Sequence, residues 1–445
     1  MGYSCVVTSL TGAPLLAEVG AEVFEDAEAF CASLRRHELF EHGEPIVVAR
    51  APGRFDVLGG IADYAGGLVL GMPIRAAALA AAQTASDGHV IAVSGQRRFA
   101  IGAADLVESP VAELALRFAG RDAWAAYVLG PLALLAREEG LDVTGLRLLL
   151  SSSIPEGKGL GSSAAVEVAS ALASCAALGV PLEPRRVALL GQRVEQLLAG
   201  APCGVMDQMT AACGEAAHVL ALSCRPAEVV GCFAFPAGVA VWGIDSGARH
   251  AVRGAPYRRA RCASFMGKTL LGVDSGYLTT LTPAEVAAER LPERMTGAEF
   301  LRRHGAVEDE MSSVEPEVAY PVRSATLHPI EERVRVERFL ELLDGPVDAA
   351  RARQLGRLMA GSHAGYTRCG LGTAATDAIV EAVVRAGWEH GLIGARVSGG
   401  GSGGTVVVVG REDAEPVVRR LSETVGAGLV SGTSPGASAF GTRVL

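Results

Sequence analysis

Apolar residues follow two spacings along the chain, and each spacing predicts a different element. Short runs rich in β-branched residues or leucine predict strands, whereas apolar residues three or four positions apart predict helices. The predicted strands cover 46–49, 68–74, 90–94, 146–152, 219–222, 239–245, 394–398 and 405–409. The predicted helices cover 21–42, 124–139, a stretch starting at Ser162, 185–199, 206–214, 334–343, 349–366 and 377–391.

This mixture of elements predicts an α+β fold with two lobes, because strands and helices do not alternate regularly. A chain of 445 residues is also long for one compact core. The segment 272–319 is polar and lacks periodicity, so we expect it to form helical excursions on the surface.

Composition narrows the function to a cytoplasmic enzyme. The net charge of −9 argues against a nucleic-acid partner, which needs a basic face. No apolar run reaches the roughly 18 residues that span a bilayer, and the start of the chain lacks the basic region of a signal peptide. The nine cysteines include no CxxC pair, which favours free thiols in a reducing compartment over a metal site.

A glycine-rich run predicts a phosphate-binding loop. Gly157, Gly159 and Gly161 lie between a predicted strand and a helix that starts with Ser162 and Ser163. Glycines let the backbone fold around an anion, and the amides and dipole of a helix start attract phosphate. The serines could cap the helix, bind phosphate or reach Mg²⁺, and Lys158 adds a positive charge. The run is neither a Walker A loop nor GxGxxG, and a structural glycine turn is the alternative.

Two acids and one arginine are candidates for the chemistry. Asp207 lies where a loop meets a helix, so it could accept a proton or orient a hydroxyl for in-line attack. Glu195, on the preceding helix, could join a serine and phosphate oxygens around Mg²⁺. Arg54 follows Pro52-Gly53, and near Asp207 it would keep that carboxylate ionised and stabilise a transferring phosphoryl group. Ordinary surface residues are the alternative for each.

Four segments carry this chemistry in a fixed order. They are Ala51-Pro52-Gly53-Arg54 running on to Asp63-Tyr64, then 155–163, 203–208 and the glycine run 398–404. By these motifs the chain resembles the GHMP small-molecule kinases. Similarity to the galactokinase branch of this family rests on Asp63-Tyr64 and 203–208. Within that branch, the chain resembles the plant arabinokinases most, over 49–64, 124–127 and 242–247. The resemblance spans roughly residues 45 to 445.

The resemblance implies a GHMP fold with the active site between two lobes. We expect an N-terminal extension over 1–44, an N-terminal domain over 45–225, which binds sugar and ATP phosphates, and a ferredoxin-like C-terminal domain over 226–445. Asp207 would be catalytic with Arg54 as its partner, and Ser163 and Glu195 would hold Mg²⁺. The residues expected at the sugar are Asp63, Gly60, Ile61, Gly204 and Tyr257. The residues expected at ATP are Gly157, Lys158, Gly159, Leu160, Gly161, Ser162, Ser163, Gly400 and Gly401.

The function that the resemblance implies is an ATP-dependent sugar 1-kinase, acting as a monomer or homodimer. Galactokinases have Gly-Glu-His-Thr-Asp-Tyr where this chain has Gly59-Gly-Ile-Ala-Asp-Tyr64, and Ser402 replaces an aromatic residue. Since the missing Glu and His contact the hydroxymethyl group of galactose, L-arabinose, which lacks that group, is the expected sugar. A galactokinase, a related sugar 1-kinase, or a non-catalytic sugar sensor are the alternatives; a phosphomevalonate-type enzyme is disfavoured by Asp63-Tyr64.

Overall fold

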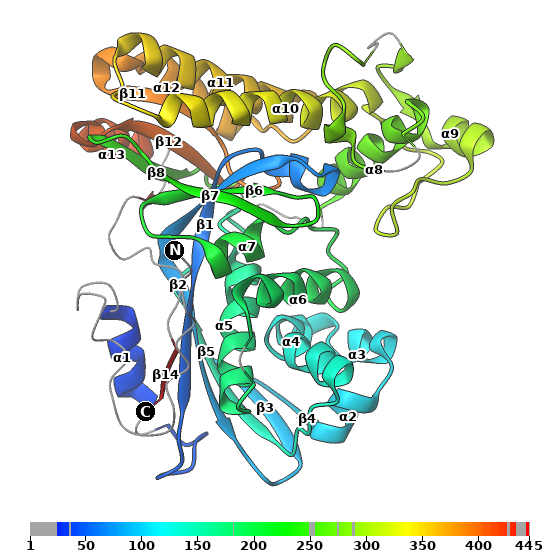
Figure 1. Cartoon of the computed structure of the whole chain (residues 1–445), viewed down its shortest axis with the longest axis vertical. Coiled ribbons are helices and arrows are strands. Elements are labelled where there is room, and N and C mark those ends of the chain that lie inside the picture. Colours follow the sequence, from blue (N-terminus) through cyan, green and yellow to red (C-terminus); the bar gives the residue numbers. More distant parts are fainter. Residues whose placement is uncertain are drawn as a thin grey trace.

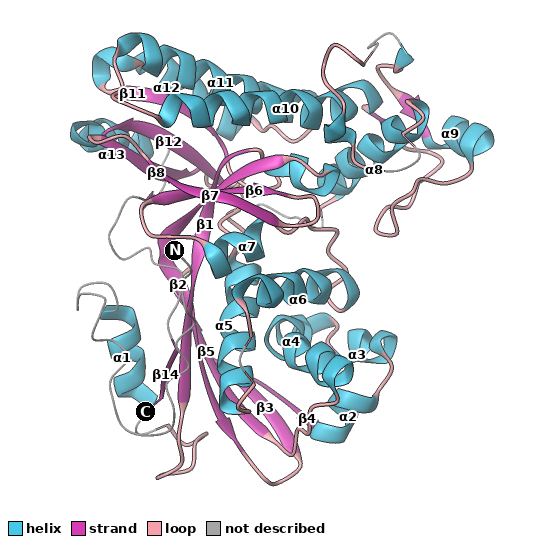
Figure 2. Cartoon of the chain, in the orientation of Figure 1, coloured by secondary structure: helices cyan, strands magenta, loops and turns pink. Residues whose placement is uncertain are grey.

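The computed structural model describes residues 25–34, 37–180, 182–248, 254–273, 276–286, 290–424, 428–432 and 442–444. Two α+β lobes are stacked along the long axis of the molecule (Figure 1), and strands and helices are mixed in both (Figure 2). In the described part of the chain, no helix combines the length and the apolar character needed to cross a membrane.

The first lobe is built on an eight-stranded sheet in the order β14-β1-β2-β5-β3-β4, with β6 and β7 extending it beside β2. Its strands are β1 (Val47–Leu58), β2 (Leu68–Thr84), β3 (His89–Ser94), β4 (Arg97–Gly102), β5 (Leu146–Ser152), β6 (His218–Ser223), β7 (Glu228–Ala234) and β14 (Thr442–Val444). Only the β3–β5 pair is parallel among the pairs described. Two strands from beyond residue 225, β7 and β14, therefore belong to this sheet.

Helices cover both faces of this sheet unequally. One face carries α2 (Ala103–Glu108), α3 (Val111–Arg117), η3 (Gly120–Asp122), α4 (Ala123–Glu139), α5 (Ser162–Ala177), α6 (Pro184–Leu197) and α7 (Met206–Cys213), and the other carries α1 (Glu25–Leu34) (Figure 1). The alternation of strand side chains explains this. Ala78 and Ala80 join the large core with α4 and α5, whereas Leu79 and Ala81 pack in the cluster that contains α1.

β1 continues through Pro52-Gly53, where we had expected a strand to end. Its register with β2 shifts between Pro52 and Arg54, and this irregularity accommodates a proline, which has no N–H to donate to the ladder. The amide of Arg54 donates instead to the carbonyl of Leu160 (2.9 Å). The local break thus joins the strand to the glycine loop.

The second lobe contains a four-stranded antiparallel sheet in the order β11-β12-β8-β13. The strands are β8 (Val239–Asp245), β11 (Leu392–Val397), β12 (Thr405–Arg411) and β13 (Leu429–Ser431). Its helices are α10 (Val322–Leu343), α11 (Ala349–Arg368), α12 (Ala374–Ala386), η6 (Trp388–His390), η7 (Glu412–Ala414) and α13 (Glu415–Thr424). This strand order is that of a ferredoxin-like lobe. The helix predicted over 334–343 is longer in the structure, where α10 starts at Val322. The buried Pro329 lies inside α10 and does not end it.

The segment 272–319, which the sequence predicted as an excursion on the surface, also packs next to the region between the two lobes. It contains η4 (Leu278–Thr280), β9 (Met295–Thr296), α9 (Gly297–His304) and β10 (Ala319–Tyr320), and it follows α8 (Ala255–Leu270). Phe300 and Tyr257 belong to one apolar cluster with Ile61 and Tyr64 of η2 (Gly60–Ala65). A buried ion pair between Arg261 of α8 and Asp309 (2.8 Å) fastens the excursion to this cluster.

Candidate active site

One cavity gathers residues from both lobes and from all four sequence motifs. It is lined by Arg54, Gly60, Ile61, Asp63, Ser163, Glu195, Cys203, Gly204, Met206, Asp207, Tyr257, Gly399 and Gly400. Ten of these are residues that the sequence singled out for catalysis, sugar, metal or nucleotide. The remaining candidates, Gly157 to Ser162 and Gly401, do not line this cavity.

Arg54 holds the carboxylate of Asp207 in a two-point ion pair. Its Nε donates to Oδ1 of Asp207 at 2.8 Å and its Nη2 to Oδ2 at 2.5 Å. The third guanidinium nitrogen donates to the carbonyl of Gly159 (2.5 Å), and Arg54 is only 3% exposed. The planar fork of an arginine fixes a carboxylate in one orientation. Asp207 therefore faces the cavity from the first turn of α7 with both oxygens held.

The glycine loop adopts the geometry that its sequence predicts. Gly157, Gly159 and Gly161 have φ angles of 69°, 68° and 68°, a left-handed conformation that favours glycine. Gly161 is also the N-cap of α5, and no serine side chain caps this helix, contrary to expectation. Ser162 and Ser163 lie in its first turn. The free amides of the helix start are thus available to an anion.

Lys158 has a partner within the protein. Its Nζ lies 2.8 Å from Oδ2 of Asp245, at the end of β8 in the second lobe. The backbone of the loop is also tied across the lobes, because the amide of Thr405 donates to the carbonyl of Lys158 (2.9 Å) and Ser398 Oγ to that of Gly159 (3.0 Å). The two glycine-rich runs therefore lie side by side.

Ser163 and Glu195 form a hydrogen-bonded pair of oxygen-bearing side chains that lines the cavity. Ser163 Oγ donates to Oε1 of Glu195 at 2.5 Å, and Glu195 is 5% exposed. Behind them, burial and the neighbouring charges of Glu195 and Asp207 raise the pKa of Glu167 well above its ordinary range. This concentration of carboxylates and a hydroxyl suits a hard cation such as Mg²⁺, which binds few protein oxygens and completes its shell with phosphate and water. The described residues include no cluster of three or more His, Cys, Asp or Glu that could hold a metal alone.

Asp63 lies against Gly204 in the same cavity. A Cβ at position 204 would lie 1.9 Å from Oδ2 of Asp63, so only glycine lets the carboxyl group rest there. Burial, followed by the nearby charge of Asp207, raises the pKa of Asp63 to about 7. Burial raises the pKa of Tyr257 as well, so its phenol stays protonated. Asp63, Tyr257 and Ile61 thus give the cavity one polar and one apolar wall.

Sequence reasoning missed the buried groups behind this wall. Asp56 and Arg396 are fully buried and form an ion pair (2.5 Å), and the hydroxyl of Tyr366 bonds the amide of Ile61. Asp56 could have been noticed, because it is a lone acid in an apolar stretch two residues after Arg54. Tyr366 lies more than 300 positions from Ile61, and no local pattern marks it.

Cysteine and histidine chemistry finds little support. Cys203 lines the cavity, but burial raises its pKa well above the ordinary range, so the thiol stays protonated. His363 is buried, and its Nε2 pairs with Asp377 (2.9 Å), as expected for a hydrogen-bonded core histidine. His250 lies outside the described residues.

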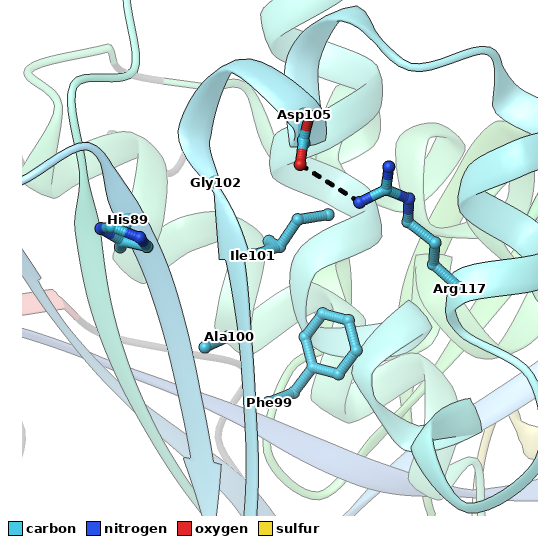
Figure 3. Close-up of a pocket in the computed structure, with 7 residues that line it drawn as sticks. All are labelled: His89, Phe99, Ala100, Ile101, Gly102, Asp105 and Arg117. Atoms are coloured by element: carbon cyan, nitrogen blue, oxygen red, sulfur yellow. Dashed lines mark hydrogen bonds and ion pairs between the residues drawn. The ribbon is translucent and has the colours of Figure 1, made fainter.

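A second hollow lies in the first lobe, away from this cavity. Figure 3 shows residues of β3, β4, α2 and α3 that line it, among them Phe99 and Ile101. Its arginine, Arg117, pairs with Asp105 (3.2 Å) and with Glu113 (2.8 Å). The hollow shares no residue with the cavity between the lobes and contains none of the sequence candidates.

The cavity contains an aspartate held by an arginine, and that arginine also bonds a glycine loop at a helix start. This combination, between two α+β lobes, defines the class of a small-molecule kinase. Family comparisons agree. GHMP kinases N terminal domain matches residues 126–215, GHMP kinases C terminal matches 347–428, and the galactokinase galactose-binding signature matches 37–84.

Individual proteins give the same result. L-arabinokinase of Arabidopsis thaliana is 37% identical over 91% of this chain, which spans 47% of that protein. Galactokinase of Streptomyces coelicolor is 32% identical over 86% of this chain and 89% of its own length. The crystal structure of Lactococcus lactis galactokinase complexed with galactose has a TM-score of 0.73 at 19% identity, covering 93% of this chain and 99% of that one.

The chain belongs to the GHMP kinase family. The identification made from the sequence and the expected α+β fold are therefore confirmed, and so is the assignment as a kinase that takes its phosphoryl group from ATP.

Proposed function

We propose that this protein is a sugar 1-kinase that transfers the γ-phosphoryl group of ATP to the anomeric hydroxyl of L-arabinose. One observation carries the proposal. The carboxylate of Asp207, clamped by Arg54, lines the same cavity as Asp63 and the Ser163–Glu195 pair. An acid on this cavity would reach both a sugar held by Asp63 and a phosphoryl group held near the pair.

In this proposal, Asp207 orients the anomeric hydroxyl for in-line attack and accepts its proton. A positioned base contributes about 10²- to 10⁴-fold to turnover. Arg54 fixes the carboxylate so that no reorientation is needed when the sugar binds, and its positive charge lies beside the reacting groups.

The nucleotide would bind where the two glycine runs meet. The amides at the start of α5 and the backbone of Gly400 and Gly401 would contact phosphate oxygens. Ser163 and Glu195 would hold Mg²⁺, which neutralises phosphate charge when bound. Lys158 would have to leave Asp245 to reach a phosphate, so we expect it to join the lobes instead.

The sugar would lie against Asp63, with Gly204, Tyr257 and the turn at Gly60 and Ile61 around it. Ile61 is 3% exposed and presents no polar side-chain atom to the cavity. A hydroxymethyl group buried there would lose its hydrogen bonds, at a cost of about 1–3 kcal/mol, or roughly 5- to 150-fold in discrimination. A pentose has no such group, and the similarity to a plant L-arabinokinase supports the same choice.

D-galactose is the second candidate, because the galactokinase galactose-binding signature matches residues 37–84. The intact set of Arg54, Asp207, Ser163 and Glu195 disfavours a non-catalytic sugar sensor, which needs none of them in these positions.

An ADP-release assay over a panel of pentoses and hexoses tests the proposal. We expect a higher kcat/KM for L-arabinose than for D-galactose. Ile61→Thr and Ile61→Val form a matched pair, since the two side chains have the same shape and only threonine carries a hydroxyl. Ile61→Thr should raise relative activity on D-galactose about 2- to 12-fold over Ile61→Val, the worth of one hydrogen bond. A wild-type preference for D-galactose would reject L-arabinose as the substrate.

Position 60 cannot be used for this test. Gly60 has a φ of 46°, and a Cβ there would lie 1.8 Å from the hydroxyl of Tyr366. A glutamate at this position, which the comparison with galactokinases suggests, would displace Tyr366 and disturb more than sugar choice.

A further inference from the structure

The backbone amides of residues 59–61, in the turn proposed to contact the sugar (the sugar-side turn), donate to buried side chains. The amide of Gly59 donates to Oε1 of Glu332 in α10 (3.2 Å), and that of Gly60 to Oδ1 of Asp56 in β1 (3.2 Å). The amide of Ile61 donates to the hydroxyl of Tyr366 in α11 (2.9 Å). These amides form the start of η2, where helix geometry leaves donors without backbone partners. Side chains from both lobes therefore fix this turn.

Two of the three acceptors also hold the second glycine run. The hydroxyl of Tyr366 donates to the carbonyl of Gly399 (2.8 Å). Oδ2 of Asp56 accepts from the amide of Gly399 (3.1 Å). Gly399 is thus bonded at both its N–H and its C=O to groups that also bond the turn at Gly60 and Ile61. The turn and the glycine run are linked through one layer of side chains.

Tyr366 has little freedom to change this arrangement. Its side chain is fully buried, and the guanidinium of Arg396 lies over its ring, 4.9 Å from the centroid. A tyrosine hydroxyl donates one hydrogen bond, and the carbonyl of Gly399 (2.8 Å) is the nearer of its two acceptors, since Oδ2 of Asp56 lies 3.5 Å away; the oxygen accepts from Ile61. The absence of a side chain at Gly60 leaves the space that the hydroxyl occupies. A displacement of Gly399 would therefore move the hydroxyl and change its bond to Ile61.

We propose that Tyr366 is a positioning residue that couples nucleotide binding to sugar binding. Resting on the proposed function, the inference is that a nucleotide held by the 398–404 run fixes Gly399, and that Tyr366 passes this constraint to the turn that contacts the sugar. Each substrate then binds more tightly when the other is present, because the linkage between two sites is reciprocal.

Calorimetric titration tests the coupling directly. L-Arabinose and D-galactose serve as sugar probes, each with and without AMP-PNP and Mg²⁺. In the wild-type protein the nucleotide should lower the sugar Kd about 5-fold or more, the lower end of typical allosteric coupling. Tyr366→Phe should reduce that factor to below about 2-fold, the range of no significant coupling.

Tyr320→Phe is the matched control. Tyr320 is also buried, and its hydroxyl likewise accepts from a backbone amide, that of Glu315 (2.9 Å), but in the excursion rather than between the two runs. This variant should keep the wild-type coupling factor. Equal loss of coupling in both variants, or full coupling in Tyr366→Phe, overturns the inference.

A second readout needs neither turnover nor sugar. In the wild-type protein, AMP-PNP with Mg²⁺ should slow deuterium exchange in a peptide that contains residues 59–63, and Tyr366→Phe should lose this slowing. If AMP-PNP does not slow deuterium exchange of this peptide in the wild-type protein, the inference is overturned, whether or not Tyr366→Phe folds. Failure to phosphorylate any sugar would instead contradict the proposed function, and this exchange result is independent of that outcome.

Discussion

Gly204→Ala is a single-methyl change that should act on the sugar site through Asp63 alone. The backbone at Gly204 is not left-handed, so alanine introduces no strain there. The added Cβ would lie 1.9 Å from Oδ2, 2.1 Å from Cγ and 2.5 Å from Oδ1 of Asp63. Ordinary van der Waals contact needs about 3.5 Å, so the carboxyl group must retreat by roughly 1.5 Å.

A misplacement of about 1 Å can cost about 10²-fold in activity. We therefore expect Gly204→Ala to lower kcat/KM for the sugar about 10²-fold, or about 2.7 kcal/mol of transition-state stabilisation, with the KM for ATP almost unchanged. Initial rates of ADP release, with sugar and ATP varied in turn, measure both parameters.

Two comparisons make the result specific. Gly102→Ala adds a methyl in the first lobe at a φ of −61°, where the nearest atom would lie 3.6 Å away, and it should behave as wild type. In an Asp63→Ala background, Gly204→Ala has no carboxyl group to displace, so it should cost little more. Near-normal kcat/KM in Gly204→Ala, or an equal cost with and without Asp63, would contradict the placement of the Asp63 carboxyl group at the sugar.

Three further predictions concern the catalytic acid, the metal and pH. Asp207→Asn should lower turnover by about 10²- to 10⁴-fold while nucleotide affinity persists in a titration, and near-normal turnover would remove Asp207 from the mechanism. Glu195→Gln, and more mildly Ser163→Ala, should shift the Mg²⁺ titration of activity to higher concentration, whereas unchanged midpoints would place the ligands elsewhere. Because the pKa of Asp63 is raised to about 7, the carboxyl group gains a proton as the pH falls through 7 and loses an acceptor for sugar hydroxyls, so kcat/KM for the sugar should fall on acidification. Asp63→Asn should flatten this profile, and a rise in wild-type kcat/KM below pH 7 would contradict the assignment.

The parts of the molecule that the sequence predicted are those with local signals. The glycine loop before α5, the helices α4 and α6 and the strands β5 and β8 were found within two or three residues of their bounds. Each combines a clear apolar period with glycine or proline at its ends. Eight of the ten cavity residues named in advance lie in the four short motifs, whereas Glu195 came from a predicted helix and Tyr257 from the family resemblance.

The errors arise where distant residues decide the local structure. Pro52-Gly53 marks a turn locally, but pairing with β2 and the bond from Arg54 to Leu160 carry the strand through. Pro329 should end a helix, yet packing in the core keeps it inside α10. Lys158 has an ion-pair partner in the second lobe, Asp245, that no local pattern records, and its binding to phosphate stays a prediction. Tyr366 bonds the amide of Ile61, and Arg396 pairs with Asp56, from far along the chain, and no sequence period records such contacts.

The most direct test of the proposed activity is a competition between L-arabinose and D-galactose at equal concentration with limiting ATP and Mg²⁺, read by ³¹P and ¹H NMR of the products. The account predicts that L-arabinose phosphorylated at carbon 1 is the main product, and that Asp207→Asn forms almost none. An excess of D-galactose 1-phosphate would contradict the choice of sugar, and phosphate at any other carbon would contradict the placement of the anomeric hydroxyl beside Asp207.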